Sequence, residues 1–134
     1  MSENFPDGTL VVVVDGTQGQ LYRNRSGDGS LKLESTGQVG PKELADDGPA
    51  GSRPKDSSPQ ENDEATFAKQ LAEYLYRHAQ RKEYDSLVLV ADPQTLGQIR
   101  PSLHQEVTKR LIKEVGKTLT NSPISDIERS IEKA

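Results

Sequence analysis

The sequence predicts an α/β protein with a mixed sheet, an antiparallel meander within it and helices on its faces. Three observations support this class. A β-branched run at 9–14 and an apolar run at 87–91 each have the length of a buried strand, and residues 64–82 between them have helical spacing. Because a helix joins two buried strands, a right-handed crossover between parallel strands is expected.

The first third of the chain is predicted to be a three-stranded antiparallel meander. The strand Thr9 to Val14 ends in Asp15-Gly16, and DGTQG is typical of a hairpin connection to a second strand beginning at Gln20. A third strand is expected from Ser30 to Ser35, where two leucines alternate with polar neighbours.

The segment from Gly37 to Asp63 is predicted to be a disordered loop. It holds four Pro and four Gly and almost no large apolar residue, so it cannot bury enough surface to offset the entropy lost on ordering. Its three basic and six acidic residues leave a net charge of −3, which would repel a phosphate group.

A helix is predicted from Glu64 to Lys82, with Asn62 or Asp63 as its N-cap. Its apolar face consists of Ala68, Leu71, Ala72, Leu75 and Ala79. Leu87 to Ala91 then forms a second buried strand, parallel to the first.

Asp92-Pro93 is typical of a helix start, because Asp accepts free amides at the N-cap and Pro has no amide to lose at the first helical position. Pro101 disfavours helical geometry at Arg100, so a short helix and a second one beginning near Pro101 are expected. The pattern from Leu103 to Leu119 does not decide between a helix and a strand. Apolar residues recur every four positions, which favours a helix, but in the second half they also alternate with polar residues, which favours a strand.

The last helix is predicted to begin after Ser122 as N-cap and Pro123, with Glu128 completing a capping pair with Ser125. Its buried face would consist of Ile124, Ile127 and Ile131.

The composition predicts a single domain over residues 1–134 and excludes several kinds of site. No cysteine is present, so disulfides, thiolate catalysis and Cys-ligated zinc are excluded. A formal charge of −4 argues against a general nucleic-acid coat protein unless basic side chains gather on one face. The sequence shows neither a secretory signal nor an apolar run near the roughly 18 residues of a membrane helix, so a soluble, cytoplasmic protein with no membrane segment is expected.

Three stretches of the chain resemble a known bacterial family: PDGTLVVVVDGTQGQLYRN, SLVLVADPQTLGQIRPSLHQEV and EVGKTLTNSPISDIERSI. They resemble the host attachment proteins, also described as proteins required for attachment to host cells, from Pro6 to Ile131 apart from the Pro/Gly-rich loop. That family is related to the central domain of archaeal and eukaryotic peptide-release factors and of Pelota. The resemblance implies a three-layer, ribonuclease-H-like fold with the order βββαβαβα, in which Leu111 to Lys117 would be a strand.

Release factors carry a Gly-Gly-Gln tip in a loop after the meander. The nearest match here is Thr36-Gly37-Gln38, which lacks the first glycine, so the resemblance does not extend to peptide release. The family supplies no catalytic residues to carry over, and neither a catalytic residue nor a cofactor is predicted.

Asp15 and Asp92 are weak candidates for a metal site, because each follows a buried strand and the two strands are expected to be neighbours. Ribonuclease-H-like nucleases hold two Mg²⁺ ions with about three or four such carboxylates, and Glu73 is the one imaginable third. The simpler interpretation is that Asp15 belongs to a turn and Asp92 caps a helix.

A basic region is the second candidate site. Its members are Arg100, Lys109, Arg110, Lys113 and Lys117. On one face they could bind RNA phosphates, whereas on a solvated surface they would form ordinary pairs with Glu106 and Glu114. No aromatic residue interleaves them, and His78 and His104 are predicted to be structural or exposed.

Two functions follow as hypotheses. The preferred one is a non-catalytic binding module of the host-attachment family, which would associate with RNA, the ribosome or a protein partner through the basic region. The alternative is a Mg²⁺-dependent, ribonuclease-H-like hydrolase that uses Asp15 and Asp92. The sequence leaves the oligomeric state open.

Overall fold

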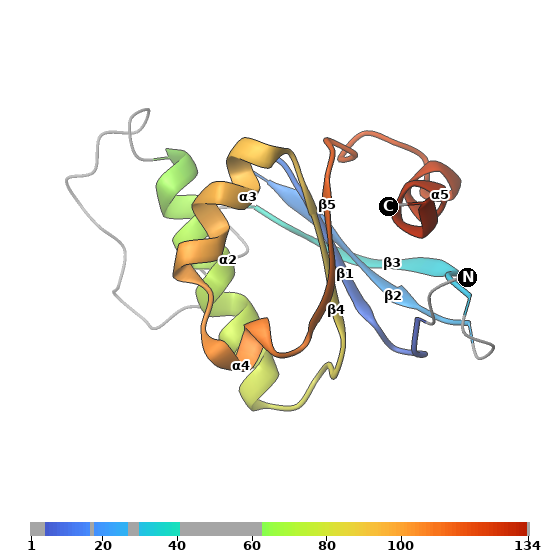
Figure 1. The fold of residues 1–134 in the computed structure, drawn as a ribbon, viewed down its shortest axis with the longest axis horizontal. Helices are drawn as coiled ribbons and strands as arrows, with labels where there is room; N and C mark the ends of the chain where they lie inside the picture. The colour runs from blue at the N-terminus through green and yellow to red at the C-terminus, as the bar shows by residue number, and fades with distance from the viewer. Residues whose placement is uncertain (1–4, 17, 27–29, 41–62, 134) are drawn as a thin grey trace.

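The computed structural model describes residues 5–16, 18–26, 30–40 and 63–133. They form a five-stranded sheet of order β3-β2-β1-β4-β5 with helices on both faces (Figure 1). The strands are β1 (Leu10–Val14), β2 (Gly19–Asn24), β3 (Leu33–Val39), β4 (Leu87–Ala91) and β5 (Leu111–Gly116). The helical elements are α2 (Asp63–Gln80), α3 (Pro93–Ile99), the 3₁₀ turn η1 (Arg100–Ser102), α4 (Gln105–Thr108) and α5 (Ile124–Lys133).

The sheet combines an antiparallel meander with parallel strands, as predicted. β1 pairs antiparallel with β2, and β2 pairs antiparallel with β3. On its other side β1 pairs in parallel with β4, which pairs in parallel with β5. The element order is βββαβαβα when α3, η1 and α4 are taken together as the helical connection between β4 and β5, and the sheet is mixed, so the fold class is confirmed.

Three layers result, with α2, α3 and α4 on one face of the sheet and α5 on the other (Figure 1). β1 is buried along its whole length because its side chains alternate between the two layers. Leu10, Val12 and Val14 join the core under α2, whereas Val11 and Val13 join the core under α5. A run of β-branched residues is therefore the sequence of a strand covered on both faces.

The helix α2 packs on the sheet through the face that its spacing predicts. Leu71 and Leu75 are fully buried, and Phe67 is 1% exposed. Burial of each such side chain stabilises the fold by roughly 1.5–3 kcal/mol. The helix ends two residues earlier than predicted, because Lys82 adopts a left-handed conformation with φ 59°.

The third strand begins at Leu33 instead of Ser30 and ends at Val39 instead of Ser35, which corrects both the predicted strand and the start of the predicted loop. β3 continues to Val39, which is 1% exposed and pairs with Gly19, so residues 37–39 are strand. A register shift in the β2–β3 pairing places Leu33 in the core under α5 and Val39 in the core under α2. Residues 41–62 of the predicted loop lie outside the described residues.

The ambiguous segment after Leu103 divides between helix and strand. The one-turn helix α4 comes first, and β5 then pairs with β4 from Leu111 to Gly116. The strand implied by the family resemblance is confirmed, one residue shorter at its end. Pro101 lies in η1, so the predicted helical break near this residue is confirmed, and the second helix begins at Gln105.

The C-terminal helix departs from its predicted capping. α5 begins at Ile124, and Glu128 accepts a hydrogen bond of 2.7 Å from the amide of Leu33 in β3 instead of closing a capping box with Ser125. Ile127 and Ile131 are fully buried, but Ile124 is 37% exposed and does not belong to the buried face. None of the helices in the described ranges is long and apolar enough to cross a membrane.

Candidate functional site

Asp15 and Asp92 lie at the same end of the sheet, each directly after the carboxyl end of one of the neighbouring parallel strands β1 and β4. Asp15 belongs to the β1–β2 hairpin. Its Oδ1 accepts the amide of Gln18 at 3.0 Å, and its own amide donates to the Gln18 carbonyl at 2.9 Å. The Thr120 hydroxyl, from the connection after β5, lies 3.4 Å from the other carboxylate oxygen. The predicted turn role of Asp15 is therefore confirmed.

Asp92 is the N-cap of α3, which also confirms the simpler interpretation. Its Oδ2 accepts the Thr95 amide at 3.1 Å, and its Oδ1 accepts the Thr95 hydroxyl at 2.7 Å. Pro93 occupies the start of the helix, where no amide is needed. The hydrogen bond from the Thr95 hydroxyl holds the pKa of Asp92 below its usual range. Both carboxylate oxygens thus have local hydrogen-bond partners.

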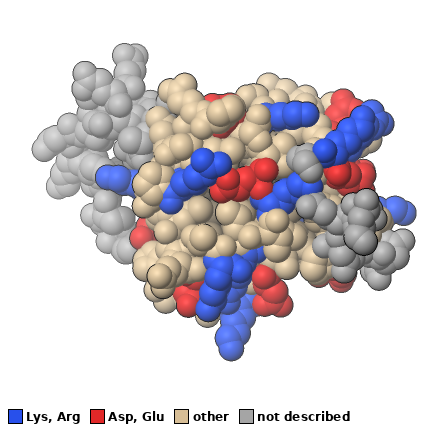
Figure 2. All heavy atoms as spheres, viewed as in Figure 1, with Lys and Arg blue, Asp and Glu red and all other residues tan. Residues whose placement is uncertain are grey.

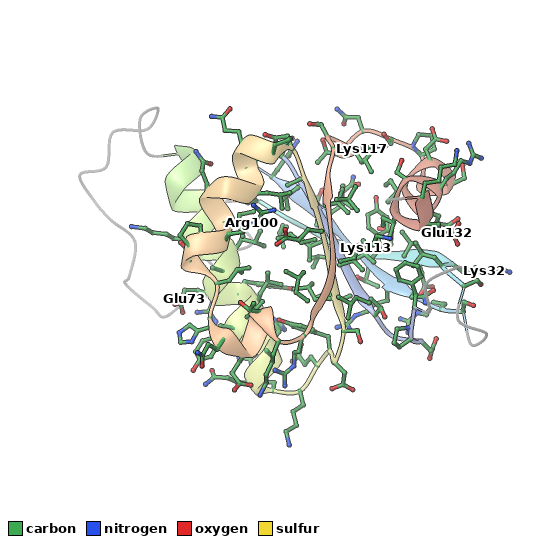
Figure 3. All side chains as sticks on the ribbon, viewed as in Figure 1. Lys32, Glu73, Arg100, Lys113, Lys117 and Glu132 are labelled. Atoms are coloured by element: carbon green, nitrogen blue, oxygen red, sulfur yellow. The ribbon has the colours of Figure 1, made fainter. Side chains whose placement is uncertain are left out.

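Glu73, the imagined third carboxylate, lies on the outer side of the helical layer (Figure 3). Its side chain is 61% exposed and sits 3.7 Å from Arg77, one turn along α2. Over the described part of the chain, no group of three or more His, Asp or Glu side chains could hold a metal ion. The strand ends therefore supply two carboxylates, where two-metal chemistry needs about three or four.

Arg100 and Lys109 project from the helical layer, and each meets a glutamate. The Arg100 guanidinium binds Glu114 of β5 at 2.5 and 3.0 Å, which raises the pKa of Arg100. The Lys109 ammonium lies 3.2 Å from Glu106. Their side chains are 56% and 62% exposed. Exposed pairs of this kind contribute about 0–1 kcal/mol, so both cations can exchange their partner for a ligand.

Arg110 is a structural residue by its contacts. Its side chain is 16% exposed and donates to the Glu106 carboxylate at 3.0 Å, the Glu106 carbonyl at 2.6 Å and the Tyr84 carbonyl at 3.2 Å. The hydrogen bond from Arg110 is the main reason that the pKa of Glu106 is lowered. Arg110 therefore fastens α4 to the connection before β4.

The remaining two basic candidates lie away from this group (Figure 3). Lys113 is on the α5 side of β5, with its ammonium 5.8 Å from the ring centre of Phe5. Lys117 follows the end of β5. On the face shown in Figure 2, Lys and Arg side chains alternate with Asp and Glu. The structure thus brings Arg100, Lys109 and Arg110 to one layer and leaves Lys113 and Lys117 outside it.

An aromatic contact beside the basic residues was missing from the sequence prediction. The exposed ring of His104 stacks on Tyr76 of α2, with ring centres 3.7 Å apart and planes 9° apart. His104 precedes α4, and its side chain makes no cap hydrogen bond. The other histidine, His78, is half-buried against Glu83 and Tyr74. Sequence spacing could not reveal the stack, because Tyr76 lies in α2 and His104 lies in the connection before α4.

The nearest match to the Gly-Gly-Gln tip is not in a loop. Gly37 and Gln38 lie within β3, opposite Leu21 and Gln20 of β2. A glutamine held in a sheet cannot serve as the tip of an extended loop. This placement agrees with the expectation that the resemblance does not extend to peptide release.

The chain was compared with protein families, with curated proteins and with solved structures. Residues 8–131 match the family described as bacterial archaeo-eukaryotic release factor family 12. No curated protein matches the chain. The fold matches 16 chains of solved structures. One of them, described as an archaeal protein, has a TM-score of 0.49 and 11% identity over 93% of this chain, which spans 36% of that protein's length.

The family match covers all the described strands and nearly all of α5. It confirms the predicted kinship with release factors, and it gives no support to the host-attachment name. The chain belongs to bacterial archaeo-eukaryotic release factor family 12.

Proposed function

We propose that this protein is a non-catalytic, translation-related module that binds single-stranded RNA through a surface formed by Arg100, His104 and Lys109. The release-factor family supports the connection to translation. One observation supports the surface: the segment from η1 to Lys109, the residue after α4, presents an exposed guanidinium, an exposed imidazole that stacks on Tyr76, and an exposed ammonium.

These three groups can make the two kinds of contact that single-stranded RNA offers, to its phosphates and to its unpaired bases. Arg and Lys side chains bind phosphate oxygens, and a flat ring can stack on an unpaired base whatever its sequence. Because His104 already rests on Tyr76, its ring is held in place before any base arrives. The formal charge of −4 makes a strong nonspecific contribution unfavourable, so binding should be weak and sensitive to salt.

Fluorescence anisotropy with a labelled single-stranded RNA tests the proposal over a series of salt concentrations. Lys109→Ala should weaken binding and reduce the slope of log K against log salt by about 0.7, the value for one phosphate contact on a single strand. His104→Ala should weaken binding by about 1–3 kcal/mol, the cost of one stacked base, and leave the slope unchanged.

Lys133→Ala is the matched control, because it removes an exposed lysine from α5 on the opposite layer. It should leave both affinity and slope unchanged. If this variant weakens binding as much as Lys109→Ala, attraction is nonspecific and the surface is wrong. If the intact protein fails to bind RNA at low salt, the RNA proposal fails and a protein partner takes its place.

A further inference from the structure

A cleft of about 370 Å³ opens at the end of the sheet opposite Asp15 and Asp92. Its walls come from the residues before β1, from the end of β2 and from the connection between α2 and β4. The volume lies within the range of small-molecule sites, about 300–1,000 Å³. Charged residues dominate its lining: Asp7, Arg23, Arg25, Lys82, Glu83 and Asp85.

Two of these charges are engaged by neighbours. Arg25 forms an ion pair of 2.7 Å with Glu34 across the β2–β3 pairing. Glu83 contacts His78 and lies 3.9 Å from Arg81. These two residues are consequently less available to a ligand than the other four.

The other four charges retain binding capacity. Over the residues that the structure describes, Asp7, Lys82 and Asp85 are exposed and form no ion pair. Arg23 is half-buried and donates one hydrogen bond of 3.0 Å to the Gly8 carbonyl, whereas a guanidinium has five N–H donors. The cleft therefore offers two cations and two carboxylates.

Lys82 occupies a backbone position that glycine would fill at lower cost. Its φ of 59° is left-handed, and its amide donates to the Ala79 carbonyl at 2.9 Å where α2 ends. A side chain at such a position costs stability relative to glycine. Lys82, which adopts this less stable conformation, also lines the cleft.

We propose that this cleft binds a small zwitterion, a molecule that carries both a carboxylate and an ammonium group. A simple anion would be repelled by Asp7 and Asp85, and a simple cation by Arg23 and Lys82. A ligand with both charges satisfies both pairs, the carboxylate at Arg23 and Lys82 and the ammonium at Asp7 and Asp85. Free amino acids and short peptides share this chemistry. The site contains none of the residues proposed to bind RNA, so it stands apart from that function.

NMR titration of the intact protein tests the proposal through the amides of Gly8, Thr9 and Ser86. The probes are glycine, glycylglycine, N-acetylglycine, glycinamide and inorganic phosphate. Glycine or glycylglycine should shift these signals saturably, and the tighter of the two identifies a free amino acid or a peptide as the class of ligand. The two singly charged compounds and phosphate should bind about tenfold more weakly or not at all.

Equal binding of N-acetylglycine or phosphate would show a plain anion site and overturn the proposal, as would equal binding of glycinamide for a plain cation site. Absence of saturable shifts with every probe would overturn it as well.

Lys82→Gly separates binding from folding. It removes the ammonium while relaxing the left-handed position, so the melting temperature should rise and zwitterion binding should weaken about tenfold. Lys69→Gly, at an exposed site inside α2, is the converse control, with lower stability and unchanged binding. Full binding by Lys82→Gly, together with full binding by Arg23→Gln, would exclude the proposed site.

Discussion

Substitution of Asp92 distinguishes a helix cap from a metal ligand. Asp92→Ala removes the hydrogen bonds to the amide and hydroxyl of Thr95. Loss of an N-cap costs about 1 kcal/mol. The Thr95 side chain belongs to a residue only 4% exposed, and its stranded hydroxyl adds about 1 kcal/mol. With an unfolding entropy of about 2.1 cal/mol/K per residue over 134 residues, a total of about 2 kcal/mol lowers the melting temperature by about 7 °C.

Asp92→Asn provides the matched comparison, because an asparagine caps a helix as well as an aspartate does. Its single amide oxygen can accept the Thr95 amide, but its amide nitrogen cannot accept the Thr95 hydroxyl, so a loss of about 1 kcal/mol is expected, about 4 °C in melting temperature at pH 7. The pKa of Asp92 is lowered in the fold, so its charge stabilises the protein above the unfolded-state pKa. That contribution is lost as the pH falls through the folded-state pKa, and the Asn variant should lack this loss.

Thermal unfolding followed by circular dichroism, with and without Mg²⁺, measures both effects. The cap interpretation is refuted if Asp92→Asn is as destabilising as Asp92→Ala at pH 7. It is also refuted if Mg²⁺ raises the melting temperature of the unmodified protein but not that of Asp92→Asn, and the hydrolase alternative would then regain support.

Three other substitutions test the packing. Gly19→Ala should destabilise the hairpin by more than about 2 kcal/mol in a denaturant titration, since its Cβ would lie 2.2 Å from a side-chain atom of Val14. Glu128→Ala should speed hydrogen exchange of the Leu33 amide about tenfold, because that amide loses its charged acceptor at 2.7 Å; unchanged exchange would show that α5 is held without it. Tyr84→Phe should cost about 1 kcal/mol, since the buried hydroxyl donates to a backbone carbonyl of α2 at 2.7 Å.

The bounds of the central strands β1 and β4 were predictable from the sequence, whereas the bounds of β3 and the strand character of β5 were not evident from the residue pattern alone. β1 and β4 are buried on both faces, so their sequences are unbroken apolar runs. The edge strands β3 and β5 each contain a register shift in their pairing. A bulge moves the following side chains to the other face, which destroys the alternation that a strand prediction relies on. In β5 this leaves Ile112 44% exposed and Lys113 on the face of Val115.

The strand-end carboxylates were predictable from local sequence because their partners are local. Asp92 accepts both hydrogen bonds from a residue three positions later, as an N-cap does. The arrangement of the basic region could not be predicted from sequence spacing. Its five cations are close in sequence but lie in a 3₁₀ turn, in the connection after α4, and in and after β5. Arg110 is half-buried and bonded to Glu106 and Tyr84, and Lys113 lies on the other side of β5. The number of basic residues in a short segment therefore does not show whether their side chains lie on one surface.

The meander explains why the cleft proposed to bind a zwitterion opens at the end of the sheet that holds the amino ends of β1 and β4. In open parallel sheets, ligands bind outside the carboxyl ends of the strands. Here those ends belong to β1 and β4, and their carboxylates are used by a hairpin and a helix cap. Because β2 runs antiparallel to β1, its own carboxyl end, with Arg23, lies beside the amino ends of β1 and β4. The antiparallel strand β2 thus places Arg23 at the opposite end of the sheet from Asp15 and Asp92, where it lines the same cleft as Lys82 and Asp85.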